Sequence, residues 1–390
     1  MKIAVALEYP LMQQGGTEVL VQELLRGLSK HFELVLVSGD SQKSDLPAEF
    51  AALISRHFSW KPSAASGPAA RALADSLFAE NIRLAHFHFG GTYEWQSNRF
   101  WRCPIYHLAN RGVPCLNTNH LAVEWLNCGC DPTRPKWQKR LFQAAAWMNR
   151  ALLYRRIKFE VAVSRHDQNR LIQQFPYYKT KILQRYHSLL SADAPPPNLT
   201  DRDPVVLCVG TIGGRKAQPL LAEAFARIAE RHPQWRLELV GRAGYQHEVQ
   251  IIQDCIVRNH LEHRILLPGR LSDAETLRRM QRASVIAMPS LQEGLGLSLQ
   301  EALFHGCVGL GTYAGGIPEL IDNESNGLLV PPGNVDALSA ALDRLISDTA
   351  LLDKLRAQCR PSIIRKGMTS SAMLQNYLEL YRTVANTSQS

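Results

Sequence analysis

A proline-rich stretch divides this chain into two similar series of strands and helices. Residues 191–204 carry three successive prolines and no apolar periodicity, which is typical of an interdomain linker. On both sides of it, short apolar runs alternate with amphipathic stretches, a pattern typical of parallel sheets covered by helices. The length of 390 residues suits two domains. We therefore predict an α/β protein with Rossmann-like domains at 1–190 and 205–369, and a helix at about 370–388 that packs back on the first.

The apolar runs give the expected elements. The strands are 2–7, 34–37, 84–89, 113–117 and 159–163 in the first domain, and 205–209, 236–240, 264–267, 285–288 and 308–311 in the second. The helices are one capped by Thr17, then 72–80, 220–230, 337–346 and 370–381. Ligands of such sheets bind beyond the carboxyl ends of the strands, so the segments that follow each strand are the candidate binding segments.

The most informative of these segments runs from Glu293 to Glu301, with the sequence Glu-Gly-Leu-Gly-Leu-Ser-Leu-Gln-Glu. A strand, a glycine turn and a helix bring unpaired backbone N–H groups together, which attracts phosphate. Carboxylates beside such a turn accept hydrogen bonds from sugar hydroxyls, so the segment predicts a nucleotide-sugar site. A structural alternative is that Ser298 and Glu301 form a capping box at the helix start.

Three further segments follow expected strands. Gly210-Thr-Ile-Gly-Gly-Arg-Lys216 carries two cations that suit a diphosphate, or is a glycine turn with two solvated cations. The pair Gly15-Gly16 leads into a helix N-terminus, where anions are favoured. His120 lies in the loop after strand 113–117. Each segment alone is weak evidence.

Together these segments resemble the retaining GT-B glycosyltransferases of family 4, over nearly the whole chain. The resemblance is carried by the paired glutamates 293 and 301, the basic loop 210–216, Gly315-Gly-Ile-Pro-Glu319, Asn326-Gly-Leu-Leu-Val-Pro-Pro-Gly333, Gly15-Gly16 and Asn119-His120. It implies two Rossmann-like domains with parallel sheets that face each other across a deep cleft. It also implies transfer of a sugar from a nucleoside-diphosphate sugar to a hydroxyl acceptor, with retention and without a metal or other cofactor.

The resemblance also implies roles for individual residues. Arg215 and Lys216 would hold the diphosphate, Glu293 would contact the sugar, and His120 would orient it at the reacting carbon. Glu301 would bind the ribose, and the loop that contains Arg270 would face the base. The remaining donor-binding residues are Gly15, Gly16, Gly210, Gly294, Gly296, Leu297, Ser298 and Leu299. A front-face attack, in which the leaving phosphate takes the acceptor proton, needs no general base.

The chain departs from the family pattern at three places. Thr211 stands where an arginine is common, and Ala217 where a glycine usually follows the lysine. The Asn-Gly pair usual before the linker is replaced by Tyr186-His187-Ser188. These differences concern the details of donor binding and leave the reaction class unchanged.

The net charge of +9 is concentrated between Lys136 and Lys158, where basic residues alternate with aromatic and aliphatic ones. A basic helix of this kind predicts an anionic membrane surface as a partner. An ordinary helix with a solvated basic face explains the same residues. No nucleic-acid-binding motif accompanies the charge, so we expect no nucleic acid.

The remaining features bear on compartment and metals. The N-terminal segment predicts a short strand, with no secretory leader, and the scattered cysteines suit a reducing compartment, so we expect a cytoplasmic protein, peripheral on the inner face of the membrane. His86-x-His88 and Cys128-x-Cys130 match no common zinc spacing, and we predict no metal site.

The expected acceptor is a saccharide or lipid-linked saccharide of cell-surface glycan synthesis, and a soluble acceptor remains an alternative. Two other functions fit the same residues. One is a sugar-nucleotide epimerase with the GT-B fold, and the other is a catalytically silent binding subunit. The presence of all the expected catalytic residues argues against the second.

Overall fold

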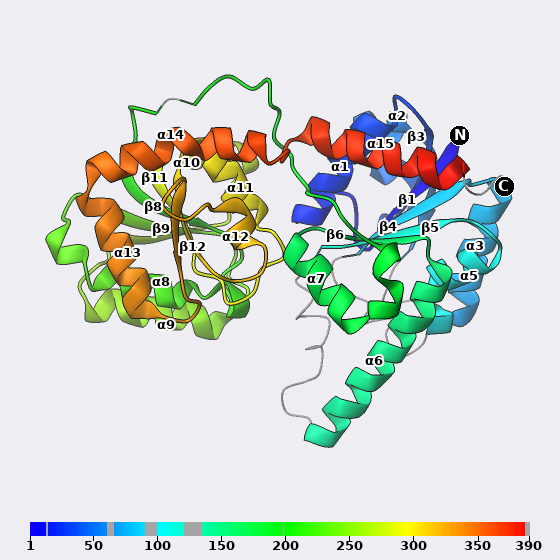
Figure 1. Cartoon of the computed structure of the whole chain (residues 1–390), viewed down its shortest axis with the longest axis horizontal. Coiled ribbons are helices and arrows are strands. Elements are labelled where there is room, and N and C mark those ends of the chain that lie inside the picture. Colours follow the sequence, from blue (N-terminus) through cyan, green and yellow to red (C-terminus); the bar gives the residue numbers. More distant parts are fainter. Residues whose placement is uncertain (13–14, 61–65, 90–99, 121–134, 198, 387–390) are drawn as a thin grey trace. The chain divides into compact units, whose positions relative to one another are not determined.

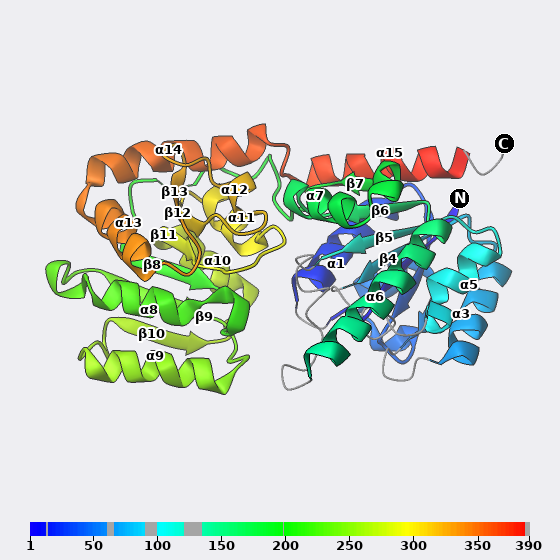
Figure 2. The ribbon, with the colours of Figure 1, turned by 60° about the horizontal axis from the view of Figure 1, so that its bottom comes forward.

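The computed structural model describes residues 1–12, 15–60, 66–89, 100–120, 135–197 and 199–386 (Figure 1). These residues form two compact units. The first contains residues 1–189 together with 370–390, and the second contains residues 190–369. Each unit is a parallel sheet with helices on its faces (Figure 2).

The described part of the first unit has a seven-stranded parallel sheet of order β3-β2-β1-β4-β5-β6-β7. Its strands are β1 (Lys2–Leu7), β2 (Glu33–Ser38), β3 (Ile54–Ser59), β4 (Leu84–Phe89), β5 (Cys115–Asn119), β6 (Phe159–Ala162) and β7 (Ile182–Gln184). Its helices are α1 (Gly16–Leu28), α2 (Ala48–Leu53), α3 (Gly67–Ala79), α5 (Pro104–Asn110), α6 (Lys136–Arg156), α7 (Arg165–Gln174) and α15 (Ser370–Asn386).

The described part of the second unit has a six-stranded parallel sheet of order β10-β9-β8-β11-β12-β13. Its strands are β8 (Asp203–Val209), β9 (Arg236–Val240), β10 (Ile265–Gly269), β11 (Ala283–Met288), β12 (Val308–Thr312) and β13 (Gly327–Val330). Its helices are α8 (Gln218–Ala226), α9 (Gln246–Arg258), α10 (Asp273–Arg282), α11 (Leu297–Phe304), α12 (Ile317–Leu320), α13 (Val335–Ser347) and α14 (Thr349–Arg365). The predicted pair of Rossmann-like parallel sheets is confirmed.

Alternation of side chains along the strands gives the first unit two cores, one on each face of the sheet. Ile3, Val5 and Leu7 of β1 pack with α1, α2 and α15, whereas Ala4 and Ala6 lie in the cluster formed with α3, α5, α6 and α7. This is the two-residue period of a strand that is buried on both faces. The same alternation places the buried polar residues Asn117 and Thr118 of β5 on opposite faces of the sheet.

Helix α15 returns the chain to the first unit. Its Met373, Tyr377 and Tyr381 are buried in the core that also holds β1 and α1, and the helix runs beside α1 in Figure 1. The stretch expected as a linker lies with the second unit, because Arg360 of α14 donates hydrogen bonds to the carbonyls of Ala192 and Pro195 at 3.3 and 2.5 Å.

Two local predictions were wrong. Strand β5 runs two residues further than expected and begins after Pro114, which has no N–H for the ladder, so His120 follows the strand directly. Thr17 caps no helix, since α1 begins one residue earlier with Gly15 as its N-cap. Strands β3, β7 and β13, which lie at sheet edges, were not expected. β7 and β13 are only three and four residues long, and β3 is polar and mostly exposed or half-buried.

A buried ion pair fixes α6 to the sheet. Arg150 of α6 donates to Glu160 of β6 at 3.0 Å, and Asn117 of β5 donates to the other oxygen of that carboxylate at 3.1 Å. The side chains of Arg150 and Glu160 are 6% and 0% exposed. Loss of one partner from such a pair leaves a buried charge without its counter-charge.

We therefore expect Glu160→Ala to lower the free energy of unfolding by about 3–5 kcal/mol. The measurement is urea unfolding followed by circular dichroism. The matched control is Glu324→Ala, which removes a half-exposed carboxylate paired with Arg344 and should cost at most about 1 kcal/mol. Equal losses in the two variants would contradict the assignment.

Candidate active site

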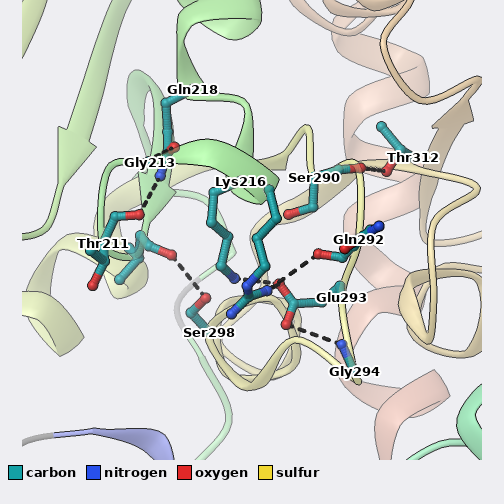
Figure 3. Close-up of polar contacts among 12 residues, drawn as sticks. Thr211, Gly213, Lys216, Gln218, Ser290, Gln292, Glu293, Gly294, Ser298 and Thr312 are labelled. Atoms are coloured by element: carbon teal, nitrogen blue, oxygen red, sulfur yellow. Dashed lines mark hydrogen bonds and ion pairs between the residues drawn. The ribbon is translucent and has the colours of Figure 1, made fainter. Parts of the chain in front are cut away.

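Two cations of the second unit converge on one carboxylate at the carboxyl ends of β8 and β11 (Figure 3). Arg215 Nη1 lies 3.2 Å from Glu293 Oε2, and Lys216 Nζ forms an ion pair with the same oxygen. Both cations lie in the turn at Gly214–Lys216. The three side chains together carry one net positive charge, from two cations and one anion.

Glu293 is held in place through its backbone as well. It is 7% exposed, its Oε1 accepts from the N–H of Gly294 at 3.3 Å, and its carbonyl accepts from Gly316 at 3.3 Å. Gly315 packs so closely here that a Cβ atom would lie 1.6 Å from the Glu293 carbonyl oxygen, so only glycine fits. Burial by itself would raise the pKa of Glu293, but Lys216 and Arg215 lower it below its ordinary value.

The basic loop is braced by a buried glutamine that was not singled out from the sequence. Gln218 Nε2 donates to the Thr211 carbonyl at 3.0 Å, and its Oε1 accepts from Gly213 N–H at 3.3 Å. Ala217 lies just before it in the left-handed conformation, with φ of 52°. This explains why glycine is usual at that position in the family it resembles, since a Cβ atom is disfavoured there.

The start of α11 decides between the two interpretations of Ser298. Gly296 is the N-cap, in the left-handed region with φ of 97°, and Ser298 Oγ donates to the Val209 carbonyl at 3.0 Å. Ser298 therefore ties α11 to the end of β8, and the capping-box alternative is wrong. Gly294, just before α11, donates its N–H to the Glu293 carboxylate, and a Cβ atom on the N-cap Gly296 would lie 3.6 Å from Glu293 Cγ. The start of α11 therefore lies beside the Glu293 side chain.

Glu301 lies one turn further along α11. Burial, with a smaller contribution from Asp273, raises the pKa of Glu301 to about 7. Asp273 begins α10, and Arg270 is exposed three residues before it. Among the residues that the structure describes, Arg270 makes no ion pair with the glutamates of α11 or its loop, so it is not brought into the cation cluster.

In the first unit, the turn at Gly15 and Gly16 already holds a carboxylate. A Cβ atom on Gly15 would lie 2.3 Å from Glu18 Oε2, so the Glu18 side chain folds back over the start of α1. Burial and, to a lesser degree, Glu8 raise the pKa of Glu18. Glu18 was not predicted from the sequence, although its position two residues after the glycine pair was the available signal.

His120 lies against two further histidines of the first unit. Its Nε2 is 3.1 Å from Nδ1 of His88, and its ring centroid is 5.0 Å from that of His187. Burial, then His187 and His88, lower the pKa of His120 well below its usual range. The imidazole is therefore neutral near pH 7.

Of the two residue pairs whose spacing was compared with zinc motifs, the structure describes only His86 and His88. His86 lies in the buried core, with its ring nitrogens 2.5 Å from Tyr381 Oη and 2.8 Å from Thr118 Oγ1. Cys128 and Cys130 lie outside the described residues. Within the described ranges, no group of three or more His, Cys, Asp or Glu side chains is placed to hold a metal ion.

Two family models match the chain, one on each half. "Glycosyltransferase Family 4" matches residues 14–184, and "Glycosyl transferases group 1" matches residues 192–363. Curated relatives include an uncharacterised glycosyltransferase of Methanocaldococcus jannaschii, 26% identical over 43% of this chain and 42% of the relative. A lipopolysaccharide core biosynthesis mannosyltransferase of Rhizobium leguminosarum is 28% identical over 38% of this chain and 42% of the relative. The chain thus spans about two fifths of the length of the curated relatives it matches.

Solved structures resemble the chain over nearly its full length. A glycosyltransferase from Rickettsia africae superposes with a TM-score of 0.73 at 18% identity, over 98% of both chains. HepE of Anabaena in complex with UDP gives a TM-score of 0.73 at 18% identity, over 98% of this chain and all of that one. At this identity the likeness shows the fold alone, which is the GT-B fold.

The pKa of Glu301 predicts a pH-dependent stability. Its ordinary value is 4.5, so between about pH 4.5 and 7 the folded chain keeps a proton that the unfolded chain has lost. The contribution of this group to stability therefore falls as the pH rises through that window. As the pH rises from 4.5 to 8, we expect the free energy of unfolding of Glu301→Gln to increase by about 1–3 kcal/mol relative to that of the parent.

The measurement is urea unfolding of parent and variant at several pH values across this window. Glu262→Gln, on the exposed turn before β10, controls for the loss of one acidic group. A stability difference between parent and Glu301→Gln that is constant with pH would contradict the prediction.

Proposed function

We propose that this chain, which belongs to the family 4 (group 1) glycosyltransferases, transfers a sugar from a nucleoside-diphosphate sugar to a hydroxyl acceptor. The observation that carries the proposal is the convergence of Arg215 and Lys216 on Glu293 beside the start of α11. Two cations and a helix N-terminus form a site for a diphosphate, and the carboxylate suits sugar hydroxyls.

The donor diphosphate takes over the cations that Glu293 holds in the free protein. Lys216 and Arg215 then stabilise the charge that grows on the leaving phosphate, with the N–H groups at the start of α11. Glu293 is released to accept hydrogen bonds from the transferred sugar. Glu301, ionised above about pH 7, accepts hydrogen bonds from the ribose hydroxyls.

The transfer proceeds with retention and without a metal. The bond between the anomeric carbon and the phosphate oxygen breaks, and the acceptor oxygen forms its bond on the same face of the sugar. The acceptor proton moves to the departing phosphate oxygen, so no enzymic base is required. His120 orients the sugar, and its lowered pKa keeps it neutral during this step.

The acceptor is a saccharide or a lipid-linked saccharide of cell-surface glycan synthesis. Support comes from relatives named as a lipopolysaccharide core mannosyltransferase and, in Mycolicibacterium smegmatis, as a phosphatidylinositol monomannoside mannosyltransferase. Support for the donor class comes from the Anabaena neighbour, whose structure holds UDP-glucose.

Helix α6 supports a peripheral membrane location on the cytoplasmic face. Trp137, Leu141 and Met148 follow one stripe of the helix, and they are 62%, 62% and 55% exposed. Helix α6 begins with Lys136, ends with two arginines and contains no acidic residue. An apolar stripe with flanking positive charge fits an anionic lipid surface. No helix in the described ranges is both long and apolar enough to cross a bilayer.

The donor proposal predicts that a nucleoside diphosphate or its sugar stabilises the protein. A thermal-shift screen with UDP, GDP, ADP and CDP sugars, with and without EDTA, should give a shift with one nucleotide that is unaffected by EDTA. Lys216→Ala should lower the affinity for that nucleotide about ten- to a hundredfold, and it should also lower the turnover of the nucleotide sugar.

The matched control for this variant is Lys354→Ala, on an exposed turn of α14, which should bind the nucleotide normally. Normal affinity in Lys216→Ala would contradict the assignment of the diphosphate site. A shift that disappears with EDTA would contradict transfer without a metal.

The membrane proposal predicts co-sedimentation with vesicles that contain anionic lipid, and much less with neutral vesicles. Replacing Trp137 and Leu141 by serine should lower the bound fraction at least tenfold, since each side chain contributes about 1.5–3 kcal/mol when buried. Val257→Ser removes an equally exposed apolar side chain of α9 and serves as the control. Binding that is unchanged by the double substitution would show that α6 is not the contact.

A further inference from the structure

We propose that His88 is a positioning residue that holds the imidazole of His120 in a single tautomer, with its proton on Nδ1. The proposal rests on the function proposed above for His120, but the tautomer can be measured without any substrate. It assigns a role to a buried side chain that the donor site does not use, and it specifies what His120 can offer to a sugar.

The sheet register brings the two histidines together. Strand β4 pairs with β5 so that His88 lies opposite Thr118 and Phe89 opposite Asn119, and His120 follows immediately. His88 is fully buried, and its Nδ1 lies 3.1 Å from His120 Nε2. This distance is a hydrogen bond between two rings, so one nitrogen carries the proton and the other accepts it.

Both rings are neutral, because burial and the neighbouring imidazoles lower the pKa of His88 and of His120 well below the usual range. A neutral imidazole carries one proton, on either Nδ1 or Nε2. The direction of the His88–His120 hydrogen bond therefore sets the proton position on both rings.

The other nitrogen of His88 decides the direction. Within the described part of the chain, His88 Nε2 is buried and has no hydrogen-bond partner. If His120 donated the bond, the His88 proton would lie on this nitrogen as a buried N–H without an acceptor. If His88 donates, only a lone pair is left there. Buried N–H groups without partners are rarer than buried acceptors without partners, so His88 Nδ1 is the donor.

It follows that His120 accepts at Nε2 and carries its own proton on Nδ1. Its basic lone pair is occupied by His88, so His120 can donate a hydrogen bond to an oxygen but has no free lone pair with which to take a proton. This agrees with a transfer in which the leaving phosphate takes the acceptor proton.

Helix α15 holds the surroundings of this pair. Tyr377 Oη lies 2.7 Å from His187 Nε2 and 3.4 Å from Thr118 Oγ1, and the His187 ring centroid lies 5.0 Å from that of His120. His187 stands where the family it resembles usually has an Asn-Gly pair. His88 and His187 therefore both contact the His120 ring, and Tyr377 holds His187 in place.

The test is a nitrogen-15 NMR spectrum of the imidazoles in the free, full-length protein, which distinguishes protonated from bare ring nitrogens. The His120 signals, assigned by their loss in His120→Gln, should show a bare Nε2 and a protonated Nδ1. A protonated Nε2 on His120 in the parent protein would overturn the proposal directly.

Substitution of His88 extends the test. In His88→Ala the His120 signals should shift toward the Nε2-protonated form that free histidine prefers, and His88→Asn, whose amide can donate from the same side, should restore the original tautomer. Once a donor is found, His88→Ala should lower kcat about ten- to a hundredfold with little change in the donor KM. A His120 tautomer unchanged in His88→Ala would also overturn the proposal.

The matched control is His86→Phe, which removes an equally buried histidine two residues earlier on β4. It should lower the melting temperature, because Tyr381 and Thr118 lose their partner, and it should leave the tautomer of His120 unchanged. A change of tautomer in this control would assign the effect to general loosening of the core and so contradict the role of His88. Failure of every nucleotide sugar to bind would count against the proposed function. It would not affect the conclusion about the His120 tautomer, which is measured in the free protein.

Discussion

Burial of both faces of each parallel sheet is the constraint on which the rest of the structure depends. A strand that is covered on both sides has no solvated face, so any polar residue on it must find its partner inside the protein. In the first unit this produces two polar groups on opposite faces of one sheet. On one face, Glu160 accepts hydrogen bonds from Asn117 and from Arg150 of α6. On the other face, His86 and Thr118 form hydrogen bonds with Tyr381 and Tyr377 of α15.

The second unit holds its charged groups differently, because two cations share one carboxylate near a helix start. Glu293 partly neutralises Arg215 and Lys216 in the free protein, and its own backbone is clamped by the close approach of Gly315. This carboxylate keeps both cations in place in the free protein, and under the proposed function a diphosphate exchanges with it for the same two partners. Preorganisation of this kind is what electrostatic catalysis requires.

Much of this could be predicted from the sequence, because it depends on local pattern. The apolar runs gave most strands within two residues, and the glycines and charges of 210–216 and 293–301 indicated the cation cluster and the start of α11. Individual side-chain contacts between distant segments could not be predicted. Nothing in the sequence near His120 indicates that His88 contacts it, because that contact depends on the register between β4 and β5. Nor does it indicate Tyr377, which lies on the C-terminal helix and contacts His187.

The role of Ser298 shows the same limit. Its spacing from Glu301 matches a capping box, and only the position of the Val209 carbonyl shows that its hydroxyl points elsewhere. Local spacing specifies which side chains can act, and the neighbouring strand determines which of them do.

The return of α15 to the first unit has a consequence for the order in which the protein is made. His187 and Tyr377 are separated by 190 positions along the chain, and His86 and Tyr381 by 295. During synthesis on the ribosome, the histidines of the first unit emerge long before the tyrosines that enclose them. The second unit, whose residues are continuous, can complete its core first. The first unit to be translated is therefore the last to be finished, because the tyrosines that contact His187 and His86 emerge only after the whole second unit has been synthesised.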